Sequence, residues 1–336
     1  MQPGKLPHRL LASLLSLVSS RDPRVVLGPG IGRDAAVIDT GGPTLLVAKA
    51  DPITFATDRI GWYAVHVNAN DIACLGARPQ WFLATIFLPE GAKPTLARSI
   101  FLQVNEACES LGIALVGGHT EVTYGLDRAI VAGAMLGEVE RERLVKPGGA
   151  RSGDALLLTS GVAIEGTSVL AREAGEALRR AGISARDLSA ARRFLVDPGI
   201  SVLPASVAVG EAVEVHAMHD PTEGGLATAL YEMAQASGLG IIVREEEIVV
   251  LPATRRLCEA AGLDPLGLLA SGALLIAADA NDARPALEAL AAAGVSAKCI
   301  GQFVRRRGVI MESNNQRRPV PRFERDEVAR FLSTQG

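Results

Sequence analysis

Alternating strand and helix patterns in both halves of the chain predict a layered α/β or α+β protein with two domains. Short apolar runs bounded by Gly and Pro are typical of strands, whereas longer stretches with apolar residues three and four positions apart are typical of helices. The length of 336 residues is enough for two domains of ordinary size. Because hydrophobic residues make up 48% of the chain and aromatic residues only 4%, we expect an aliphatic core.

The first half is expected to begin with an amphipathic helix that ends near Ser20. Its apolar stretch, residues 10–18, is too short and too interrupted by Ser for a membrane span, and no small-residue cleavage site follows it. Strands are then expected at residues 35–39, 44–50, 81–88, 113–116 and 129–137, and helices at 60–75 and 95–111. The Gly- and Pro-containing turn at 40–43 predicts that the first two strands form a hairpin.

A domain boundary is predicted at residues 145–154, where Pro, Gly and charged residues separate two apolar strands. We therefore expect an N-terminal domain at residues 1–147, a C-terminal domain at 148–310 and a polar tail with a short helix at 311–336. In the C-terminal part, strands are expected at 155–159, 240–244, 272–277 and 299–304, helices at 165–174, 177–196, 200–210, 225–237 and 325–332, and a loop at 305–321.

Composition argues against several classes of protein. The net charge of −3 is unlike that of a general nucleic-acid binder, although a local basic pocket for phosphate remains compatible with it. The four cysteines are Cys74, Cys108, Cys258 and Cys299. They are isolated and form no CxxC motif, which argues against a zinc or disulfide framework. We expect reduced thiols, a cytoplasmic location, and no nucleic-acid or membrane partner.

Four aspartates in short Gly-, Asn- or Thr-rich motifs are the strongest functional signal. They are Asp34 in GPGIGRDAAV (residues 28–37), Asp51 in AKADPIT (48–54), Asp71 in NANDIACLGARP (68–79) and Asp220 in HDPTEGGLA (219–227). Several loops that each deliver a carboxylate can hold Mg²⁺ against phosphate oxygens, because Mg²⁺ prefers oxygen ligands and takes one or two carboxylates directly. Taken singly, Asp51 is also explained as a turn residue before Pro, and Thr222 and Glu223 as caps of the following helix.

Asn68, Asn70 and Asp71 interrupt the apolar pattern of an expected helix. Asn and Asp are poor residues for a helix interior, and charged groups are rarely buried unless they are paired or bind a cation. The alternative is a polar stripe exposed to solvent, but the surrounding residues are too apolar for that. The pattern therefore favours a functional site.

A Gly-rich loop precedes Asp34. Gly28, Gly30 and Gly32 allow positive φ and a close approach of backbone N–H groups to an anion. An ordinary connection between a helix and a strand explains them equally well. The pattern is not the GxxxxGK[ST] of a P-loop.

A fifth motif, VGGHTEVT at residues 116–123, has a His where the other motifs have an acid. The imidazole of His119 can position a phosphate, bind a metal or act as a base, and the alternative is a capped turn. Further histidines, His66, His216 and His219, leave a three-His zinc site open, although nothing in their spacing supports one.

Together these motifs resemble the aminoimidazole ribonucleotide synthetase superfamily of PurM-like proteins. The superfamily includes thiamine monophosphate kinase, selenophosphate synthetase and the HypE-type carbamoyl dehydratase of hydrogenase maturation. The similarity runs from about residue 25 to residue 302. HDPTEGGLAT resembles the DPTRGGLAT of HypE-type proteins, NANDIACLGARP resembles a family segment ND-A-MGA-P, and GIGRDAAV resembles GDDAAV with Arg33 in place of the first Asp.

The resemblance implies a two-domain PurM-like fold. In it, the N-terminal sheet pairs with its twin across a homodimer, and a C-terminal α/β domain covers a cleft that holds Mg·ATP. It implies Asp34, Asp51 and Asp71 as Mg²⁺ or phosphate-site ligands, and catalytic roles for Asp71, for His119 and for Asp220, which approaches from the second domain. Contacts to ATP are implied for Gly28, Gly30, Gly32, Asn68, Asn70, Gly117, Gly118 and Thr120.

Two departures from the family pattern bear on the reaction. His119 replaces an acid that helps to hold metal in relatives, which implies one fewer carboxylate, a different metal count or a substrate contact. HypE-type enzymes carry the carbamoyl group on a C-terminal Cys, whereas this sequence ends FLSTQG and its last cysteine is Cys299. Cyanide-ligand synthesis on that carrier is therefore not expected. The selenophosphate branch needs a reactive Cys or selenocysteine in its N-terminal Gly-rich region, and none stands there.

Three hypotheses for function remain. The first is an ATP-dependent enzyme of the HypE-like branch that transfers the γ-phosphoryl group of ATP to an amide, carbonyl or hydroxyl oxygen of an unidentified small molecule. The second is a small-molecule kinase that resembles thiamine monophosphate kinase. The third is a non-catalytic nucleotide-binding scaffold that works with a partner protein in hydrogenase maturation.

Overall fold

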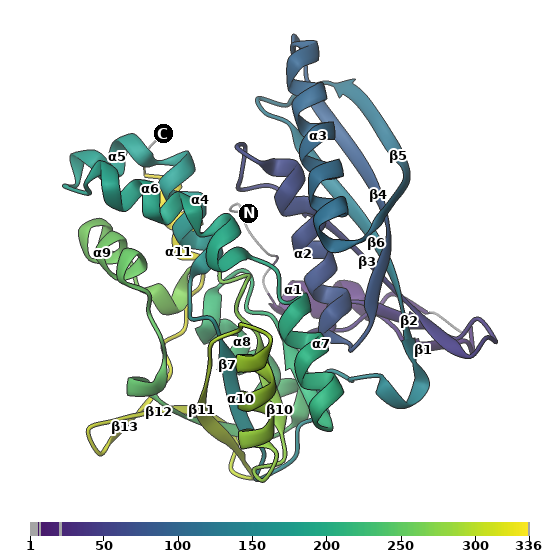
Figure 1. Cartoon of the computed structure of the whole chain (residues 1–336), viewed down its shortest axis with the longest axis vertical. Coiled ribbons are helices and arrows are strands. Elements are labelled where there is room, and N and C mark those ends of the chain that lie inside the picture. Colours follow the sequence, from purple (N-terminus) through teal and green to yellow (C-terminus); the bar gives the residue numbers. More distant parts are fainter. Residues whose placement is uncertain (1–5, 7, 20–21, 335–336) are drawn as a thin grey trace. The chain divides into compact units, whose positions relative to one another are not determined.

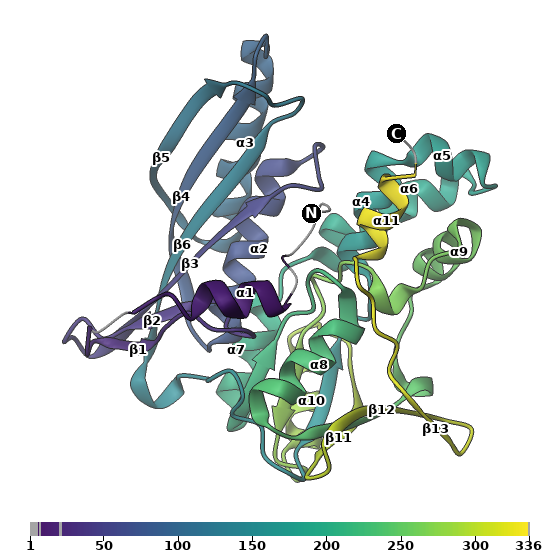
Figure 2. The same ribbon diagram turned by 180° about the vertical axis from the view of Figure 1, so that it is seen from behind.

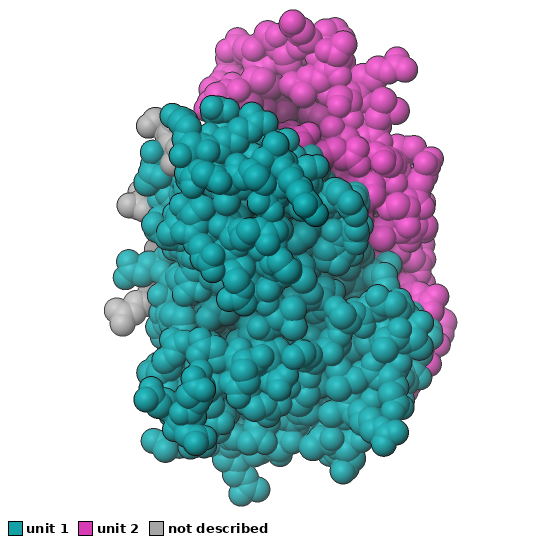
Figure 3. Space-filling model, turned by 60° about the vertical axis from the view of Figure 1, so that its left-hand side comes forward, with its two compact units in different colours: residues 1–18, 30–33, 145–336 teal, residues 19–29, 34–144 magenta. Residues whose placement is uncertain are grey.

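The computed structural model describes residue 6, residues 8–19 and residues 22–334, and it contains two compact units. Unit 2 comprises residues 19–29 and 34–144, and unit 1 comprises residues 1–18, 30–33 and 145–336, as coloured in Figure 3. Each unit has its own mixed sheet with helices packed on it (Figure 1). This two-sheet architecture confirms the predicted fold class.

Unit 2 is built on a six-stranded sheet in the order β1-β2-β3-β6-β4-β5. Its strands are β1 (Val25–Leu27), β2 (Ala36–Ile38), β3 (Thr44–Ile53), β4 (Arg78–Pro89), β5 (Ala114–Thr123) and β6 (Ile130–Glu140). β4 and β5 run parallel, while the other neighbours are antiparallel. The β2–β3 pair confirms the predicted hairpin, and a short 3₁₀ turn, η1 (Arg141–Arg143), follows β6.

Helices α2 (Ile60–Cys74) and α3 (Pro94–Leu111) cover one face of this sheet, as Figures 1 and 2 show from opposite sides. From Phe82 onward β4 alternates, because Phe82, Ala84 and Ile86 are buried while the residues between them are only half-buried. Both helices begin and end within a residue of the sequence prediction. Gly112, in the left-handed conformation, ends α3 as expected.

Unit 1 is built on a seven-stranded sheet in the order β13-β12-β9-β11-β7-β10-β8. Its strands are β7 (Ala155–Thr159), β8 (Val215–His219), β9 (Gly240–Arg244), β10 (Leu275–Ala278), β11 (Ala297–Val304), β12 (Gly308–Ser313) and β13 (Gln316–Pro319). Only the β9–β12 pair is parallel. Every residue of β7 and β10 is buried, so the centre of this sheet is covered on both faces.

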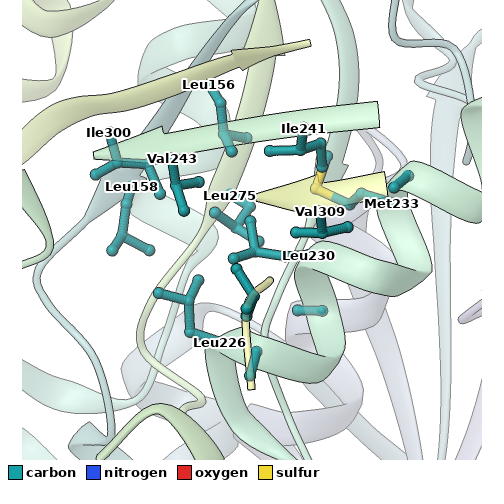
Figure 4. Close-up of a cluster of buried hydrophobic side chains, with 14 of the residues drawn as sticks. Leu156, Leu158, Leu226, Leu230, Met233, Ile241, Val243, Leu275, Ile300 and Val309 are labelled. Atoms are coloured by element: carbon teal, nitrogen blue, oxygen red, sulfur yellow. The ribbon is translucent and has the colours of Figure 1, made fainter. Parts of the chain in front are cut away.

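The core of unit 1 lies between the sheet and helix α8 (Gly225–Ser237). Figure 4 shows aliphatic side chains from the helix meeting those of the strands. The labelled members are Leu156, Leu158, Leu226, Leu230, Met233, Ile241, Val243, Leu275, Ile300 and Val309. Aromatic side chains are scarce here, as the composition predicts.

The remaining helices of unit 1 are α1 (His8–Leu15), α4 (Ile164–Glu173), α5 (Gly175–Arg180), α6 (Ala185–Arg193), α7 (Leu203–Ala212), α9 (Pro252–Ala261), α10 (Ala283–Ala292) and α11 (Glu327–Leu332), with the short turns η2 (Leu195–Gly199), η3 (Glu245–Glu247) and η4 (Pro265–Gly267). Of these helices, α7 and α10 contact the sheet, whereas α4, α5, α6, α9 and α11 contact one another (Figure 1). α1 ends at Leu15, before the expected end near Ser20, which lies outside the described residues.

Several sequence predictions for unit 1 are wrong. Residues 305–321, expected to be a loop, form the β12–β13 hairpin. The expected helix at 177–196 is two helices, because Gly182 has a φ of 94° and Ser184 caps α6 by accepting from the Asp187 N–H. Strand β8 and helices α9 and α10 were not predicted.

One helical stretch of the described chain, Ala185–Ala212, is long and apolar enough by composition to span a membrane. It is not a continuous helix. Asp197 leaves the helical conformation with φ −148° and ψ 105°, and Pro198 follows it, so the stretch divides into α6, η2 and α7.

Candidate nucleotide and metal site

Helix α2 brings the predicted polar residues into the interior of unit 2. Every residue of α2 except Trp62 is buried, and the residues Asn68, Asn70 and Asp71 are 0%, 0% and 3% exposed. A helix that is apolar nearly all round is a core helix, so these three polar side chains are held between α2 and its surroundings. The alternative of a solvent-exposed polar stripe is therefore wrong.

Asn68 ties α2 to strand β3. Its side-chain Nδ2 donates to the backbone oxygen of Asp51 at 3.2 Å and to that of Ala64 at 2.8 Å. Gly133 on β6 makes this possible, because a Cβ at that position would lie 2.5 Å from Asn68 Nδ2. The amide of Asn68 thus fixes the distance between the helix and the strand that carries Asp51.

Lys49, Asp51 and Asp71 form a linked group of charges. The Lys49 ammonium lies 2.8 Å from Asp71 Oδ2 and 3.5 Å from Asp51 Oδ2. Lys49 and Asp51 are two positions apart on β3, opposite the buried Met135 and Gly133 of β6, and so share the face of the sheet that α2 covers. Asp34 acts electrostatically on both Lys49 and Asp71.

The charges of this group perturb one another. Burial raises the pKa of the Asp71 carboxyl to about 7, although Lys49 opposes the rise. Burial by itself lowers the pKa of Lys49, but the carboxylates of Asp71, Asp51 and Asp34 outweigh that effect and raise it. Lys49 therefore stays protonated at neutral pH. A titratable group whose pKa is strongly shifted by burial and specific charges is typical of functional sites.

The position of Asp51 differs from the prediction in one respect. The sequence predicted a strand at residues 44–50 with Asp51 at its end. Strand β3 instead continues to Ile53, and Asp51 stands opposite Gly133 in the ladder. The side chain is partly open to solvent, with 39% of it exposed.

The Gly-rich loop lies between β1 and β2. Of its three glycines, Gly32 alone has a positive φ, 70°. A side chain would be strained at Gly32, whereas nothing in the backbone angles of Gly28 or Gly30 demands glycine. Asp34 follows directly and is half-buried.

His119 lies within strand β5, whereas the sequence predicted that it follows a strand at residues 113–116, and the alternative of a capped turn is wrong. Its side chain is 64% exposed, and its Nε2 lies 3.1 Å from Glu121 Oε2. Gly118 is required where β5 approaches β4, because a Cβ there would overlap the backbone of Ala84. A cavity of about 420 Å³ lies between α3 and these two strands, with His119 and Thr120 in its lining.

In unit 1, Asp220 follows strand β8 and is 1% exposed. The preceding His219 contacts Glu232 on α8, with 2.9 Å between Nε2 and Oε2. Gly224 and Gly225 turn the chain into α8 with φ values of 83° and 62°. The motif thus forms a tight loop between a strand end and a helix N-terminus, a place where backbone N–H groups can receive an anion.

The C-terminal segment reaches the same loop. Asp326 Oδ2 accepts from the Gly224 N–H at 2.8 Å, and Oδ1 accepts from the Val328 N–H at 2.7 Å. Burial raises the pKa of Asp326 to about 7, against the effect of these two hydrogen bonds. Gly224 occupies the N-cap position of α8, so neither Thr222 nor Glu223 is its N-cap residue.

The other histidines have partners of their own. His66 stacks on Trp62 with ring centroids 4.4 Å apart, and burial lowers its pKa to about 4. His216 Nδ1 lies 2.8 Å from Asp154 Oδ2. These contacts explain His66, His216 and His219 within their own units without a zinc ion.

Lys49 and Asp326 were missed by the sequence predictions. A signal for Lys49 was present, because a Lys stands in the apolar run of β3 two positions before Asp51. For Asp326 the only signal was its suitability as a helix N-cap before α11. Each also has a partner far away in sequence, Asp71 for Lys49 and Gly224 for Asp326.

The chain belongs to the AIR synthase-related family. Residues 32–139 match the AIR synthase related protein N-terminal domain, and residues 151–313 match the C-terminal domain. A putative hydrogenase expression/formation protein of Methanocaldococcus jannaschii is 31% identical over 86% of this chain and 87% of its own. The carbamoyl dehydratase HypE of Cupriavidus necator is 34% identical over 81% of this chain and 77% of its own.

Solved structures of the same fold agree with this assignment. HypE in complex with ATP matches with a TM-score of 0.67 and 26% identity, covering 97% of both chains. The HypE chain of a HypE–HypF complex matches with a TM-score of 0.72 and 25% identity, covering 87% of this chain and 94% of that one. Thiamine monophosphate kinase from Aquifex aeolicus, at 20% identity and a TM-score of 0.68 over 90% of this chain and 95% of its own, shares the fold.

Proposed function

We propose that this chain is an ATP-dependent enzyme that transfers the γ-phosphoryl group of ATP to an amide, carbonyl or hydroxyl oxygen of a small molecule. The observation that carries the proposal is the group of Asp51, Asp71 and Lys49 between α2 and β3, with Asp34 acting on it. A HypE structure that matches this chain is a complex with ATP, and other matching relatives are named carbamoyl dehydratases.

The donor set of unit 2 fits Mg²⁺. Its acidic groups offer only carboxylate oxygens, the ligands that Mg²⁺ prefers, and one of them is buried while another is partly open to solvent. Asp34, Asp51 and Asp71 are the residues we assign to hold the ion. Bound there, Mg²⁺ neutralises charge on the phosphates during transfer.

The chain's own residues position these groups. Asn68 fixes β3 against α2, and so fixes the separation of Asp51 from Asp71. We assign a supporting role to Asn70, and contacts to ATP to Gly28, Gly30, Gly32, Gly117, Gly118 and Thr120. We assign Asp220 and His119 to the acceptor or to the transferred phosphoryl group, because both stand on strand ends or edges with titratable side chains.

A homodimer forms part of the proposal. The face of the unit 2 sheet opposite α2 and α3 carries cross-strand apolar pairs, Trp81 with Leu136 and Leu83 with Ala134. The neighbouring edge strand β5 exposes apolar side chains, among them Val116 and Val122 at 53% and 58%. An exposed apolar edge strand can pair with another chain. We propose that a second copy of this sheet pairs with it.

A partner protein is a further part of the proposal. A matching structure is a complex of HypE with HypF, and a matching relative is named for hydrogenase expression or formation. We propose that the chain acts in such a maturation pathway, where the acceptor is presented by or released from a partner.

The products of ATP turnover test the reaction. Purified protein is given Mg·ATP with a metabolite extract, and ³¹P NMR follows ADP, free phosphate and new phosphoesters. We expect ADP whose formation depends on the extract. Matching free phosphate identifies the dehydratase or ligase type, and a new phosphoester identifies a kinase. ATP that stays intact with the extract and with the purified partner argues against the enzyme and for a nucleotide-binding scaffold.

A further inference from the structure

Lys49 is a cation placed inside a group of acids. Its side chain is 18% exposed, and its ammonium lies 2.8 Å from Asp71 Oδ2 and 3.5 Å from Asp51 Oδ2. Asp34 also acts on it electrostatically. In the sequence, Lys49 stands at an inward-facing position of an apolar strand, where a Lys is costly unless it is paired.

A single Mg²⁺ ordinarily needs fewer than three carboxylates from a protein. The ion usually takes one or two carboxylates and completes its shell with water and phosphate oxygens. A third carboxylate at the same place calls for a further positive charge, which in two-metal sites is a second divalent ion. Lys49 already supplies a fixed positive charge there, in contact with two of the three acids.

We propose that the ammonium of Lys49 serves as a built-in monovalent cation of this acidic site. With Lys49 present, the site binds one divalent cation together with the nucleotide. Without the charge of Lys49, the three carboxylates would bind two divalent cations. This inference rests on the proposed ATP site of unit 2. The ammonium already lies next to Asp71 and Asp51, and its charge repels a second ion there. Lys49 is thus a positioning residue that sets the metal count.

A purely structural ion pair is the competing hypothesis. Such a pair would hold β3 against α2 and affect stability, yet it would leave the number of bound metal ions unchanged. The metal count therefore separates the two hypotheses, whereas a loss of stability or activity does not.

The test counts Mn²⁺ bound per chain by electron paramagnetic resonance, with a non-hydrolysable ATP analogue at saturation. We expect one nucleotide-dependent Mn²⁺ for the wild type. Lys49→Met keeps the length of the side chain but removes its charge, and we expect a second Mn²⁺ and at least tenfold tighter Mn²⁺ binding without nucleotide. Lys49→Arg keeps the charge, and we expect it to bind one nucleotide-dependent Mn²⁺ per chain, as the wild type does.

Lys298→Met is the matched control, because Lys298 forms an exposed ion pair with Glu247 in unit 1. It is expected to bind Mn²⁺ as the wild type does. An unchanged count and affinity in Lys49→Met, or two ions in the wild type, overturns the inference and leaves the proposed function standing. No nucleotide-dependent Mn²⁺ in the wild type overturns both. Where Lys49→Met fails to fold, Lys49→Gln is counted in its place because it also removes the charge, and an unchanged count in that variant overturns the inference.

Discussion

Gly133 on β6 sets how closely α2 can approach its sheet. A Cβ at this position would lie 2.5 Å from Asn68 Nδ2 and 2.6 Å from the Phe82 ring. We expect Gly133→Ala to lower the free energy of unfolding by about 1–3 kcal/mol, because the core must shift to admit the methyl group. Urea denaturation of the wild type and the variant measures this difference.

Gly210→Ala is the control for that prediction. Gly210 lies within α7, and a Cβ there meets nothing within 4 Å. The replacement is expected to be neutral or to stabilise by about 0.5–1 kcal/mol, as Ala does in a helix interior. Equal effects of the two substitutions would refute the steric role of Gly133.

Asp326 makes the stability of unit 1 depend on pH. Burial raises its pKa from 3.8 to about 7. The folded state therefore keeps a proton that the unfolded state releases, so this contribution to stability is full below pH ~4, falls as pH rises toward ~7, and is lost above that. The loss amounts to roughly 4 kcal/mol at most, from ~1.4 kcal/mol for each pH unit.

Urea denaturation of the wild type and Asp326→Asn at pH 5 and pH 8 measures this effect. Asn cannot titrate, so we expect the wild type to lose more stability between the two pH values than the variant does. Identical pH dependence of the two proteins would show that Asp326 has an ordinary pKa.

At the scale of residues, the sequence predicted which polar side chains are buried better than it predicted which residues they contact. Asn68, Asn70 and Asp71 could be assigned to a buried site because polar residues rarely interrupt an apolar helical pattern unless they are paired or bind a ligand. Lys49 could not be placed beside Asp71, because their contact depends on how α2 packs on β3. His119 was expected after the strand at residues 113–116, yet β5 continues through it because Gly117 and Gly118 pair with β4.

At the scale of elements, the C-terminal segment is fastened to unit 1 by side chains from α8. The Tyr231 hydroxyl donates to the Val320 carbonyl at 2.7 Å, and the Arg322 guanidinium lies 3.8 Å from the centre of the Tyr231 ring. Asp326 then bonds the loop before α8. The segment that follows β13 is therefore part of the fold of unit 1.

Tyr231→Phe tests this fastening. The substitution removes one hydrogen bond and keeps the ring, so we expect a loss of about 1 kcal/mol in the free energy of unfolding. Tyr124→Phe is the matched control, because Tyr124 is 86% exposed, and no change is expected there. Chemical denaturation measures the free energy of unfolding of the wild type and both variants. If Tyr231→Phe is as stable as the wild type, the Val320 contact is not formed in solution.

Elements with a strong apolar period were predictable, and those that depend on distant partners were not. The helix α2 and the strands β7 and β9 follow from local patterns and were found within a residue or two. The β12–β13 hairpin was missed because β13, QRRP, is polar, and because β12 pairs with β9, a segment far away in sequence. Strand β8 was missed for a similar reason, since VHAMH is short and carries two histidines.

At the scale of the whole molecule, the uncovered face and edge of the unit 2 sheet predict self-association. Val122→Glu places a charge on the exposed edge strand β5, and we expect it to convert a dimer into monomers with little effect on folding. Val26→Glu is the matched control, because Val26 is 42% exposed on β1 at the opposite edge of the same sheet. Sedimentation velocity measures the mass, and a monomeric wild type at micromolar concentration would contradict the proposal.

Asp71 is the residue on which the proposed ATP site depends most directly. Isothermal titration of the wild type with a non-hydrolysable ATP analogue, with and without Mg²⁺, is the most direct test, with Asp71→Asn as the variant. Asp127→Asn, in an exposed loop of the same unit, is its matched control. We expect Mg²⁺-dependent binding by the wild type and by Asp127→Asn, and affinity weakened tenfold to a hundredfold in Asp71→Asn, as expected for about 1.4–3 kcal/mol. Binding by a folded Asp71→Asn that is as tight and as Mg²⁺-dependent as in the wild type would contradict the assignment of the site.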